Sequence, residues 1–318
     1  MKILSVDIGF GDVKVIYGTD DKIEKQFKFI SGISVTKKNP YVDDTRILEY
    51  KDHFYYVGDD TTRQPSENRI DLKDYKNLEY YAPVLLYRVL ETINDFDPDI
   101  LVVGLSKAQI DNSGYFEEAI KEFKVQGKDI KFKKVVVVPQ GSGAKITTDM
   151  YGSHFPKLQD EFMGKTTYVG VDLGFNTLDL FYVMNGETSP ALFQGLEHEG
   201  VMKIAALVAQ EILKNHNREI GLHEAKEILD SGYYNLRGQK HDYKEFVETV
   251  KKNYLKELLI LIENHYGKIL DKCDFVMITG GGSALFKNSD GFIRTPSSNH
   301  EFYNAIGQYE LGKRFLKS

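Results

Sequence analysis

The sequence predicts an α/β protein built from two similar halves, because one motif is repeated and strand-like segments alternate with helix-like ones. VDIGFGDVKVIY (Val6 to Tyr17) returns as VDLGFNTLDLFY (Val171 to Tyr182), with valine, aspartate, glycine, phenylalanine and the final tyrosine in register. In each half, nearly apolar runs alternate with amphipathic stretches, as is typical of parallel strands covered by helices. A chain of 318 residues has the length of roughly two domains.

The elements follow from local patterns. Each copy of the motif is expected to form a strand, a tight glycine turn and a returning strand. Buried strands are predicted at DILVVGL, KKVVVVP, TTYVGVDL and DFVMITG, and helices at YYAPVLLYRVLETI, YFEEAIKEF, GVMKIAALVAQEIL and DYKEFVETVKKNYLKELLILIENHYGKIL. The segment from about Ser31 to Asp74 differs, and its short alternating runs predict a small inserted subdomain. The break between the halves is expected near Gly152 to Gly164.

Composition excludes several classes of function. A formal charge of −6 and a pI near 5.8 argue against a dominant sequence-independent DNA-binding surface. No run approaches the length of a membrane span, and the amino terminus enters the first strand without a signal-peptide pattern. The single cysteine, Cys273, is consistent with a reducing compartment. We therefore expect a cytoplasmic protein that binds neither membranes nor nucleic acid directly.

The repeated motif places Asp7 and Asp172 at strand ends, each followed by a glycine turn. Such a turn lets backbone N–H groups approach an anion closely, while the carboxylate can hold a hydrated cation. One turn of this kind is weak evidence, since Asp-Gly turns are common in hairpins. Two in one chain suggest two halves that face a shared nucleotide.

Two further strand ends carry residues suited to such a cleft. VVVVPQGSGA places Gln140 at the carboxyl end of a buried strand, where its amide could orient a water; a helix-capping role is the alternative. VMITGGGSAL ends a strand in Gly280, Gly281 and Gly282 before an expected helix, so that a ligand could lie against the backbone and the helix N-terminus. This run is neither a GxGxxG pattern nor a P-loop. NAIGQYELGKRFL predicts a carboxy-terminal helix, either close-packed through small residues or simply amphipathic.

In this order, the segments resemble those of the actin superfamily of ATPases. VDIGFGDVK matches the first phosphate loop, VVVVPQGSGA the first hinge helix, VGVDLGFNTLD the second phosphate loop, ITGGGSAL the adenosine loop and NAIGQYELG the second hinge helix. PQGSGA, with glutamine in place of the more usual glutamate, and the NAIGQYELGKRF ending are most similar to plasmid-segregation actins of the ParM type and their archaeal relatives. The resemblance implies an actin-like, ribonuclease H-like duplicated fold, with two domains around a nucleotide cleft. It implies a first domain of residues 1–152, with the insertion at about 31–74, and a second of 153–318, whose helix 300–317 returns to the first.

The resemblance also implies roles for individual residues. Asp7 and Asp172 would hold the hydrated magnesium ion and orient the attacking water, and Gln140 would position that water. Residues expected to contact the phosphates are Gly9, Phe10, Gly11 and Lys14 on one side and Gly174, Asn176 and Thr177 on the other, with Asp179 opposite Lys14 in the repeat. Gly280, Gly281 and Gly282 would line the adenosine. Glu227 would reach the ribose or base, although an exposed helix face beside Glu224 is an equal alternative.

The function implied is hydrolysis of ATP, or of GTP, with Mg²⁺ as cofactor and coupled to assembly of filaments. Such filaments would move cargo such as plasmid DNA through a separate adaptor that binds DNA. The alternative is a small-molecule kinase of the same superfamily, acting on a sugar or an acetate-like acceptor, but the sequence offers no convincing acceptor-activating aspartate. A chaperone or regulatory ATPase that never polymerises is a third, disfavoured possibility.

Overall fold

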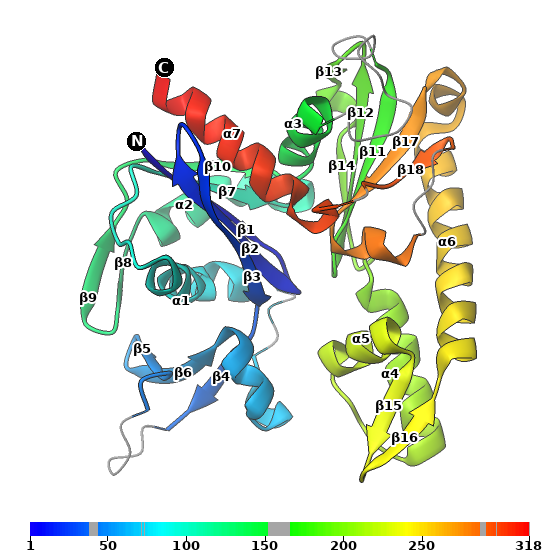
Figure 1. Cartoon of the computed structure of the whole chain (residues 1–318), viewed down its shortest axis with the longest axis horizontal. Coiled ribbons are helices and arrows are strands. Elements are labelled where there is room, and N and C mark those ends of the chain that lie inside the picture. Colours follow the sequence, from blue (N-terminus) through cyan, green and yellow to red (C-terminus); the bar gives the residue numbers. More distant parts are fainter. Residues whose placement is uncertain are drawn as a thin grey trace.

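The computed structural model describes residues 1–37, 44–70, 72, 74–151, 166–286, 291–296 and 298–317. The chain forms two α/β halves that lie side by side, each built on its own main sheet (Figure 1). The predicted boundary between residues 152 and 153, and the predicted break as a whole, lie outside the described residues.

The first sheet has the strand order β10-β7-β1-β2-β3. Its strands are β1 (Lys2–Ile8), β2 (Asp12–Thr19), β3 (Ile23–Ile30), β7 (Ile100–Leu105) and β10 (Val135–Pro139). The first three are antiparallel neighbours, whereas β7 runs parallel to β1 and to β10. The buried apolar runs predicted as parallel strands are therefore confirmed, and β7 is buried along its whole length.

Both faces of the first sheet are covered because its strands alternate apolar residues toward each side. Leu4 and Val6 belong to a core that includes helix α1 (Tyr75–Ile93) and helix α2 (Ser113–Lys121). Ile3 and Val102 face the other way, into a core formed with the carboxy-terminal helix α7 (Tyr303–Lys317). The last helix of the chain thus packs on the first sheet.

The second sheet repeats this plan. Its strands are β11 (Tyr168–Leu173), β12 (Thr177–Met184), β13 (Glu187–Thr188), β14 (Gln194–Glu197), β17 (Phe275–Thr279) and β18 (Ile293–Arg294). An antiparallel hairpin, β11–β12, is again flanked by a parallel strand, β17, as β1–β2 is by β7. One face packs against helices α4 (Met202–His216) and α6 (Lys244–Tyr266), and the other against helix α3 (Ser142–Tyr151).

The far end of the second half consists of helix α5 (Leu222–Ser231) and a hairpin of β15 (Tyr233–Leu236) and β16 (Gln239–Asp242). A second small hairpin, β8 (Glu122–Val125) with β9 (Lys128–Lys131), belongs to the first half. The helix predicted at YFEEAIKEF ends early, at Lys121, because the residues that follow pair as β8. No helix in the described part of the chain is long and apolar enough to cross a membrane.

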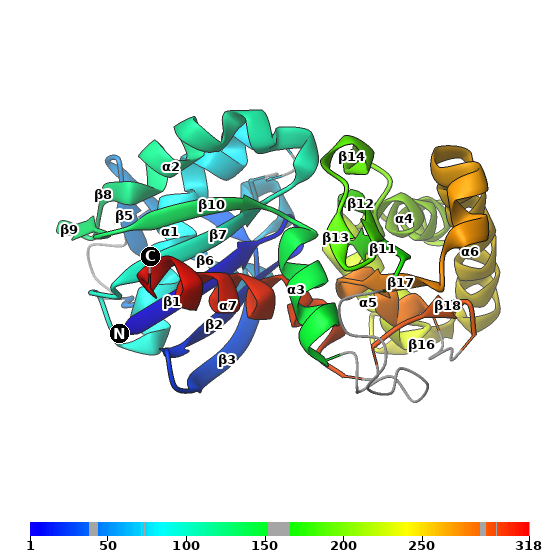
Figure 2. The same ribbon diagram turned by 90° about the horizontal axis from the view of Figure 1, so that it is seen from above.

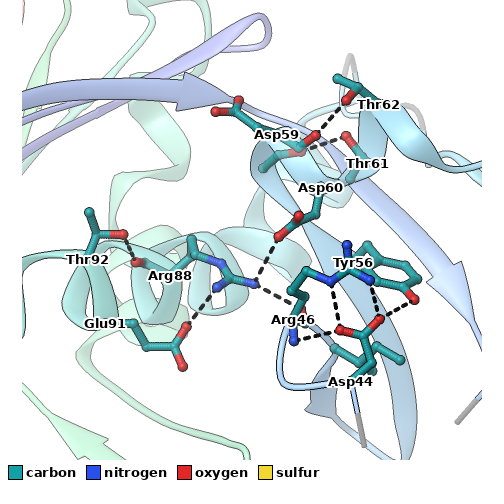
Figure 3. A network of polar contacts seen from close by, with 12 residues as sticks. Asp44, Arg46, Tyr56, Asp59, Asp60, Thr61, Thr62, Arg88, Glu91 and Thr92 are labelled. Atoms are coloured by element: carbon teal, nitrogen blue, oxygen red, sulfur yellow. Dashed lines mark hydrogen bonds and ion pairs between the residues drawn. The ribbon is translucent and has the colours of Figure 1, made fainter. Parts of the chain in front are cut away.

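The segment predicted as an insertion contains a three-stranded sheet, β4 (Ile33–Thr36), β6 (His53–Val57) and β5 (Leu48–Tyr50), in that spatial order. Figure 3 shows how polar groups fasten it to α1. Arg88 of α1 donates to the Arg46 carbonyl oxygen (2.9 Å), and its Nη2 lies 3.9 Å from Asp60 Oδ2. Arg46 in turn pairs with Asp44, which also accepts a hydrogen bond from Tyr56 (2.9 Å).

Helices α3 and α7 lie against each other where the two halves meet (Figure 2). Their contact depends on glycine at Gly143 and Gly307, since a Cβ on either residue would collide with backbone atoms of the other helix. The close helix contact predicted from the small residues of NAIGQYELG is therefore observed.

Candidate functional site

A cavity of about 440 Å³ lies between the two halves, at the ends of β1 and β11. Residues from both hairpins line it, together with the ends of β10 and β17. The lining includes these residues predicted from sequence: Asp7, Gly9, Phe10, Gly11, Lys14, Gln140, Asp172, Gly174, Thr177, Gly280, Gly281 and Gly282. Segments that are far apart in the chain are thus brought to one place.

Asp7 is buried at the end of β1, where the hairpin register sets it opposite Lys14. The Lys14 ammonium lies 3.2 Å from Asp7 Oδ2, and Gln140 Nε2 donates to Asp7 Oδ1 at 2.7 Å. Burial disfavours the charged ammonium, but the carboxylates of Asp7, Asp12 and Asp172 outweigh it and raise the pKa of Lys14 to about 12. Lys14 is therefore a permanent positive charge in the cavity wall.

Asp172 occupies the equivalent position at the end of β11 and is also buried. Its Oδ2 accepts a hydrogen bond from Asn304 Nδ2 at 2.5 Å. Burial and the nearby charge of Asp7 raise the pKa of Asp172 to about 6, against smaller opposing effects of Lys14 and Asn304. A cation between the two carboxylates would relieve this repulsion.

The two aspartates suit a hydrated magnesium ion better than a metal held by protein ligands alone. Within the described residues, no group of three or more histidine, cysteine, aspartate or glutamate side chains is placed to hold a metal. Mg²⁺ commonly keeps several waters and takes only one or two carboxylates, with phosphate oxygens completing its shell. The donor set of Asp7 and Asp172 fits that description.

The glycine run after β17 approaches Asp172 closely. Gly280 has a φ of +85°, and a Cβ there would lie 2.5 Å from Asp172 Oδ1, so a side chain would both strain the backbone and displace the carboxylate. The helix expected after the glycines is a short 3₁₀ helix, Gly281–Leu285, which already includes Gly281 and Gly282 and ends in extended backbone at Phe286. A ligand would meet the backbone of this short turn rather than an α-helix N-terminus.

Asn176 and Asp179 do not line the cavity, although the sequence places them in the ligand-binding set. Asp179 is fully buried behind the loop, where its Oδ1 accepts hydrogen bonds from Ser106 Oγ (3.0 Å) and the Lys107 backbone N–H (2.8 Å). Burial and the charge of Asp172 raise the pKa of Asp179 well above its usual value. Asn176 Oδ1 faces His198 Nδ1 at 3.1 Å. Asp179 thus joins the second hairpin to the first half, and Asn176 joins the second loop to the segment that follows β14.

Glu227 also lies outside this cavity. It lines a second cavity of about 440 Å³, between α5 and the inserted subdomain, together with Glu224 and Arg69. Phe10 and Phe175 line both cavities, so the second opens beside the first. In this conformation Glu227 faces the neighbouring space rather than the site of the two aspartates.

Several residues of the site carry no signal that sequence analysis could have used. Asn304 reaches Asp172 from α7, across 132 positions of chain. Ser31 fixes the first loop, because its Oγ donates to the Gly9 carbonyl oxygen (2.5 Å) and its N–H to that of Gly11 (3.0 Å). Gln109 lines the cavity and donates to Glu197 of the other half at 2.6 Å. These contacts arise from packing between distant elements. Of the three residues, Asn304 alone lies in a predicted motif, the carboxy-terminal helix NAIGQYELGKRFL.

Two family models match the chain, one in each half. Residues 5–143 match the family described as actin like proteins N terminal domain, and residues 170–289 match that described as archaeal actin homologue MreB-like, C-terminal. No curated protein matches the sequence.

Solved structures of actin-like proteins share the whole fold. The pCBH ParM non-polymerisable quadruple mutant is similar with a TM-score of 0.78 and 22% identity, covering 99% of each chain. The 15-stranded ParM filament from Clostridium botulinum gives 0.77 and 21%, again over 99% of each chain. The archaeal actin homolog Ta0583 in complex with ADP gives 0.76 and 18%, over 99% of this chain and 100% of that one. The actin-like, two-lobed α/β fold predicted from the sequence is confirmed.

Proposed function

The chain belongs to the actin-like superfamily, and on that premise we propose that it binds ATP with Mg²⁺ between its halves, hydrolyses it and assembles into filaments. One observation carries the proposal. Two buried aspartates, one from each copy of the repeated hairpin, line a single cavity together with Lys14 and Gln140. GTP is the alternative nucleotide.

The residues of the cavity have distinct tasks in this proposal. Asp7 and Asp172 bind the hydrated metal and hold its waters, while Lys14 offers a point charge to the β-phosphate. The metal, when bound, supplies charge stabilisation to the phosphate oxygens. Gly9, Gly11 and Gly174 leave room for phosphates against the backbone, and three glycines, Gly280, Gly281 and Gly282, do so for the adenosine.

Gln140 orients the attacking water. An amide can hold a water by hydrogen bonding but cannot take its proton, so its contribution is geometric. Its Nε2 donates to Asp7 Oδ1 at 2.7 Å, which fixes the side chain beside the metal-binding carboxylate.

Assembly follows from closure of the cavity. A γ-phosphate that contacts both hairpins fixes the angle between the halves, so every subunit presents the same faces, whereas ADP leaves that angle loose. Repetition of one heterologous contact then yields a filament. The similar ParM of Clostridium botulinum is a filament structure, which supports this part of the proposal. Because the chain carries a net charge of −6, DNA cargo would require a separate, basic adaptor.

Light scattering and sedimentation with ATP, a non-hydrolysable analogue, ADP and no nucleotide test assembly. We expect polymer with the first two, little with ADP, and no change on addition of naked DNA. In a parallel ATPase assay, Asp172→Ala should lower turnover on the order of a hundredfold or more, because it removes a carboxylate that holds the metal-bound water. Asp129→Ala, at a carboxylate with 81% side-chain exposure, is the matched control. A protein that stays monomeric and phosphorylates a sugar or acetate-like acceptor would be a kinase instead.

A further inference from the structure

Each aspartate of the cavity accepts a hydrogen bond from one buried carboxamide. Gln140 Nε2 donates to Asp7 Oδ1 at 2.7 Å, and Asn304 Nδ2 donates to Asp172 Oδ2 at 2.5 Å. Both amides are almost fully buried, with 8% of Gln140 and 4% of Asn304 exposed. Asn304 is thus the counterpart of Gln140 on the second half of the site.

The orientation of the Asn304 amide is fixed by its other end. Its Oδ1 accepts hydrogen bonds from the backbone N–H groups of Gly141 (2.9 Å) and Ala144 (3.1 Å), at the start of α3. These two donors require an oxygen, so the amino group must face the other way. That direction leads to Asp172, whose carboxylate requires a donor.

Asn304 also connects parts of the molecule that are far apart in the chain. It lies in the first turn of α7, which packs on the first sheet, whereas Asp172 ends a strand of the second sheet. Gly141 directly follows Gln140. One side chain therefore holds the carboxylate of the second half and the backbone beside the amide of the first half.

We propose that Asn304 is a positioning residue, which holds the Asp172 carboxylate in the orientation that binds the hydrated metal. Through Gly141, it also fixes the position of this carboxylate relative to Gln140. The inference rests on the proposed function. A carboxylate without its donor can rotate about its side-chain torsions, and the oxygen that should face the metal is then no longer fixed. Removal of outer partners of metal ligands typically costs about 10–100-fold in metal affinity or activity.

Asn304→Ala tests the role, with Thr147→Val as matched control. Thr147 Oγ1 donates to the Tyr303 carbonyl oxygen at 2.6 Å, so the control also loses one buried hydrogen bond between α3 and α7 but leaves both aspartates untouched. Asn304→Ala should lower kcat about tenfold or more with KM for ATP nearly unchanged. The Mg²⁺ concentration needed for half-maximal thermal stabilisation of the protein with a non-hydrolysable ATP analogue should rise about tenfold.

Thr147→Val should change neither quantity more than about twofold, even if both variants melt at lower temperature. Equal behaviour of the two variants would overturn the proposal and make Asn304 a structural residue of the helix junction. Wild-type protein without Mg²⁺-dependent hydrolysis would overturn the proposed function itself, which the same assay reports separately.

A second pair of variants tests the contact without nucleotide. Asn304→Asp keeps an oxygen for Gly141 and Ala144 but sets two carboxylates against each other, so the melting temperature should fall. Adding Asp172→Asn restores one donor and one acceptor, and the melting temperature should recover by at least half of the loss, beyond the change that Asp172→Asn causes alone. Independent, additive effects of the two changes would show that the side chains are not coupled, and would overturn the proposal even if Asn304→Ala does not fold.

Discussion

The two hairpins of the repeat pair their strands in the same way, but at one matching position the first carries a lysine and the second an aspartate. In each, the aspartate that ends the first strand is paired in register with a residue of the second: Asp7 with Lys14, and Asp172 with Asp179. Lys14 neutralises its partner through a 3.2 Å ion pair. Asp179 adds a second carboxyl group, which is turned away to accept hydrogen bonds from Ser106 and Lys107.

This difference assigns different tasks to the two halves of a duplicated fold. The first hairpin carries its own countercharge, so its aspartate is stable without any ligand. The second hairpin carries no basic residue opposite its aspartate, and burial together with the charge of Asp7 raises the pKa of Asp172 to about 6. The second hairpin is thus the part of the site that gains most from a bound cation. The following changes to the chain test that asymmetry.

Lys14→Met should have the largest effect, because it removes the ammonium group that lies 3.2 Å from the buried Asp7 carboxylate. Loss of one partner of a buried pair costs about 3–5 kcal/mol in the free energy of unfolding. Urea denaturation without nucleotide or magnesium, near neutral pH, measures it. Lys124→Met is the control, since its pair with Asp129 is largely exposed and should be worth well under about 1 kcal/mol. Equal losses of unfolding free energy in the two variants would show that Lys14 does not stabilise the buried carboxylates.

The pH dependence of the stability of Asp172→Asn measures how much the ionised Asp172 carboxylate destabilises the wild type. A carboxyl whose pKa is raised on folding stabilises the protein below its unfolded pKa, and that stability is lost as pH rises through the folded pKa of about 6. The window is therefore about pH 4 to 6. Between these pH values, the free energy of unfolding of the variant should rise by about 2 kcal/mol relative to that of the wild type in magnesium-free buffer. A constant difference across the window would mean that Asp172 titrates normally.

Much of the fold and the centre of the site could be predicted because local patterns encode them. The repeated hairpin, the apolar parallel strands and the glycine turns lie in short stretches of sequence, and each copy positions its own aspartate. The exceptions have physical causes. The helix expected after the glycine run is a five-residue 3₁₀ helix that begins within the run, at Gly281. Asn304, Ser31 and Gln109 join the site through contacts between distant elements, which no local pattern reveals.

Asp179 and Glu227 illustrate a different limit. The sequence shows that Asp179 follows the second glycine turn and that Glu227 lies on a helix, but not which way each side chain turns. Asp179 faces Ser106 because its strand lies against the segment that follows β7, and Glu227 faces the second cavity because α5 stands beside the inserted subdomain. Side-chain direction is decided by packing between halves. Whether either residue contacts a nucleotide stays a prediction.

Gln140→Ala should have an intermediate effect. The structure gives Gln140 a second partner, Asp7, so the variant loses both the water-orienting amide and one hydrogen bond to a metal-binding carboxylate. We expect hydrolysis to slow about tenfold with ATP affinity nearly unchanged, since orientation of the water is lost but phosphate contacts are kept. Filaments should persist longer after ATP is exhausted. Equal losses of nucleotide affinity and rate would instead make Gln140 a structural cap of α3.

Asp179→Asn should have the smallest effect, although Asp179 is the more deeply buried of the two acids of its hairpin. Burial and the charge of Asp172 raise its pKa well above the usual value, so the carboxyl is held in its neutral form under mildly acidic conditions. An amide is nearly isosteric with a neutral carboxyl, and its oxygen can still accept from Ser106 and Lys107. We therefore expect the free energy of unfolding at mildly acidic pH to change by less than about 1 kcal/mol.

Denaturation over a range of pH completes this test. As pH rises, the wild type must ionise a buried carboxyl whereas the variant has nothing to ionise, so the variant should become the more stable of the two. A loss of more than about 2 kcal/mol at mildly acidic pH would mean that the ionised carboxylate is the native form. Asp179 would then be a buried negative charge that the hydrogen bonds from Ser106 and Lys107 stabilise.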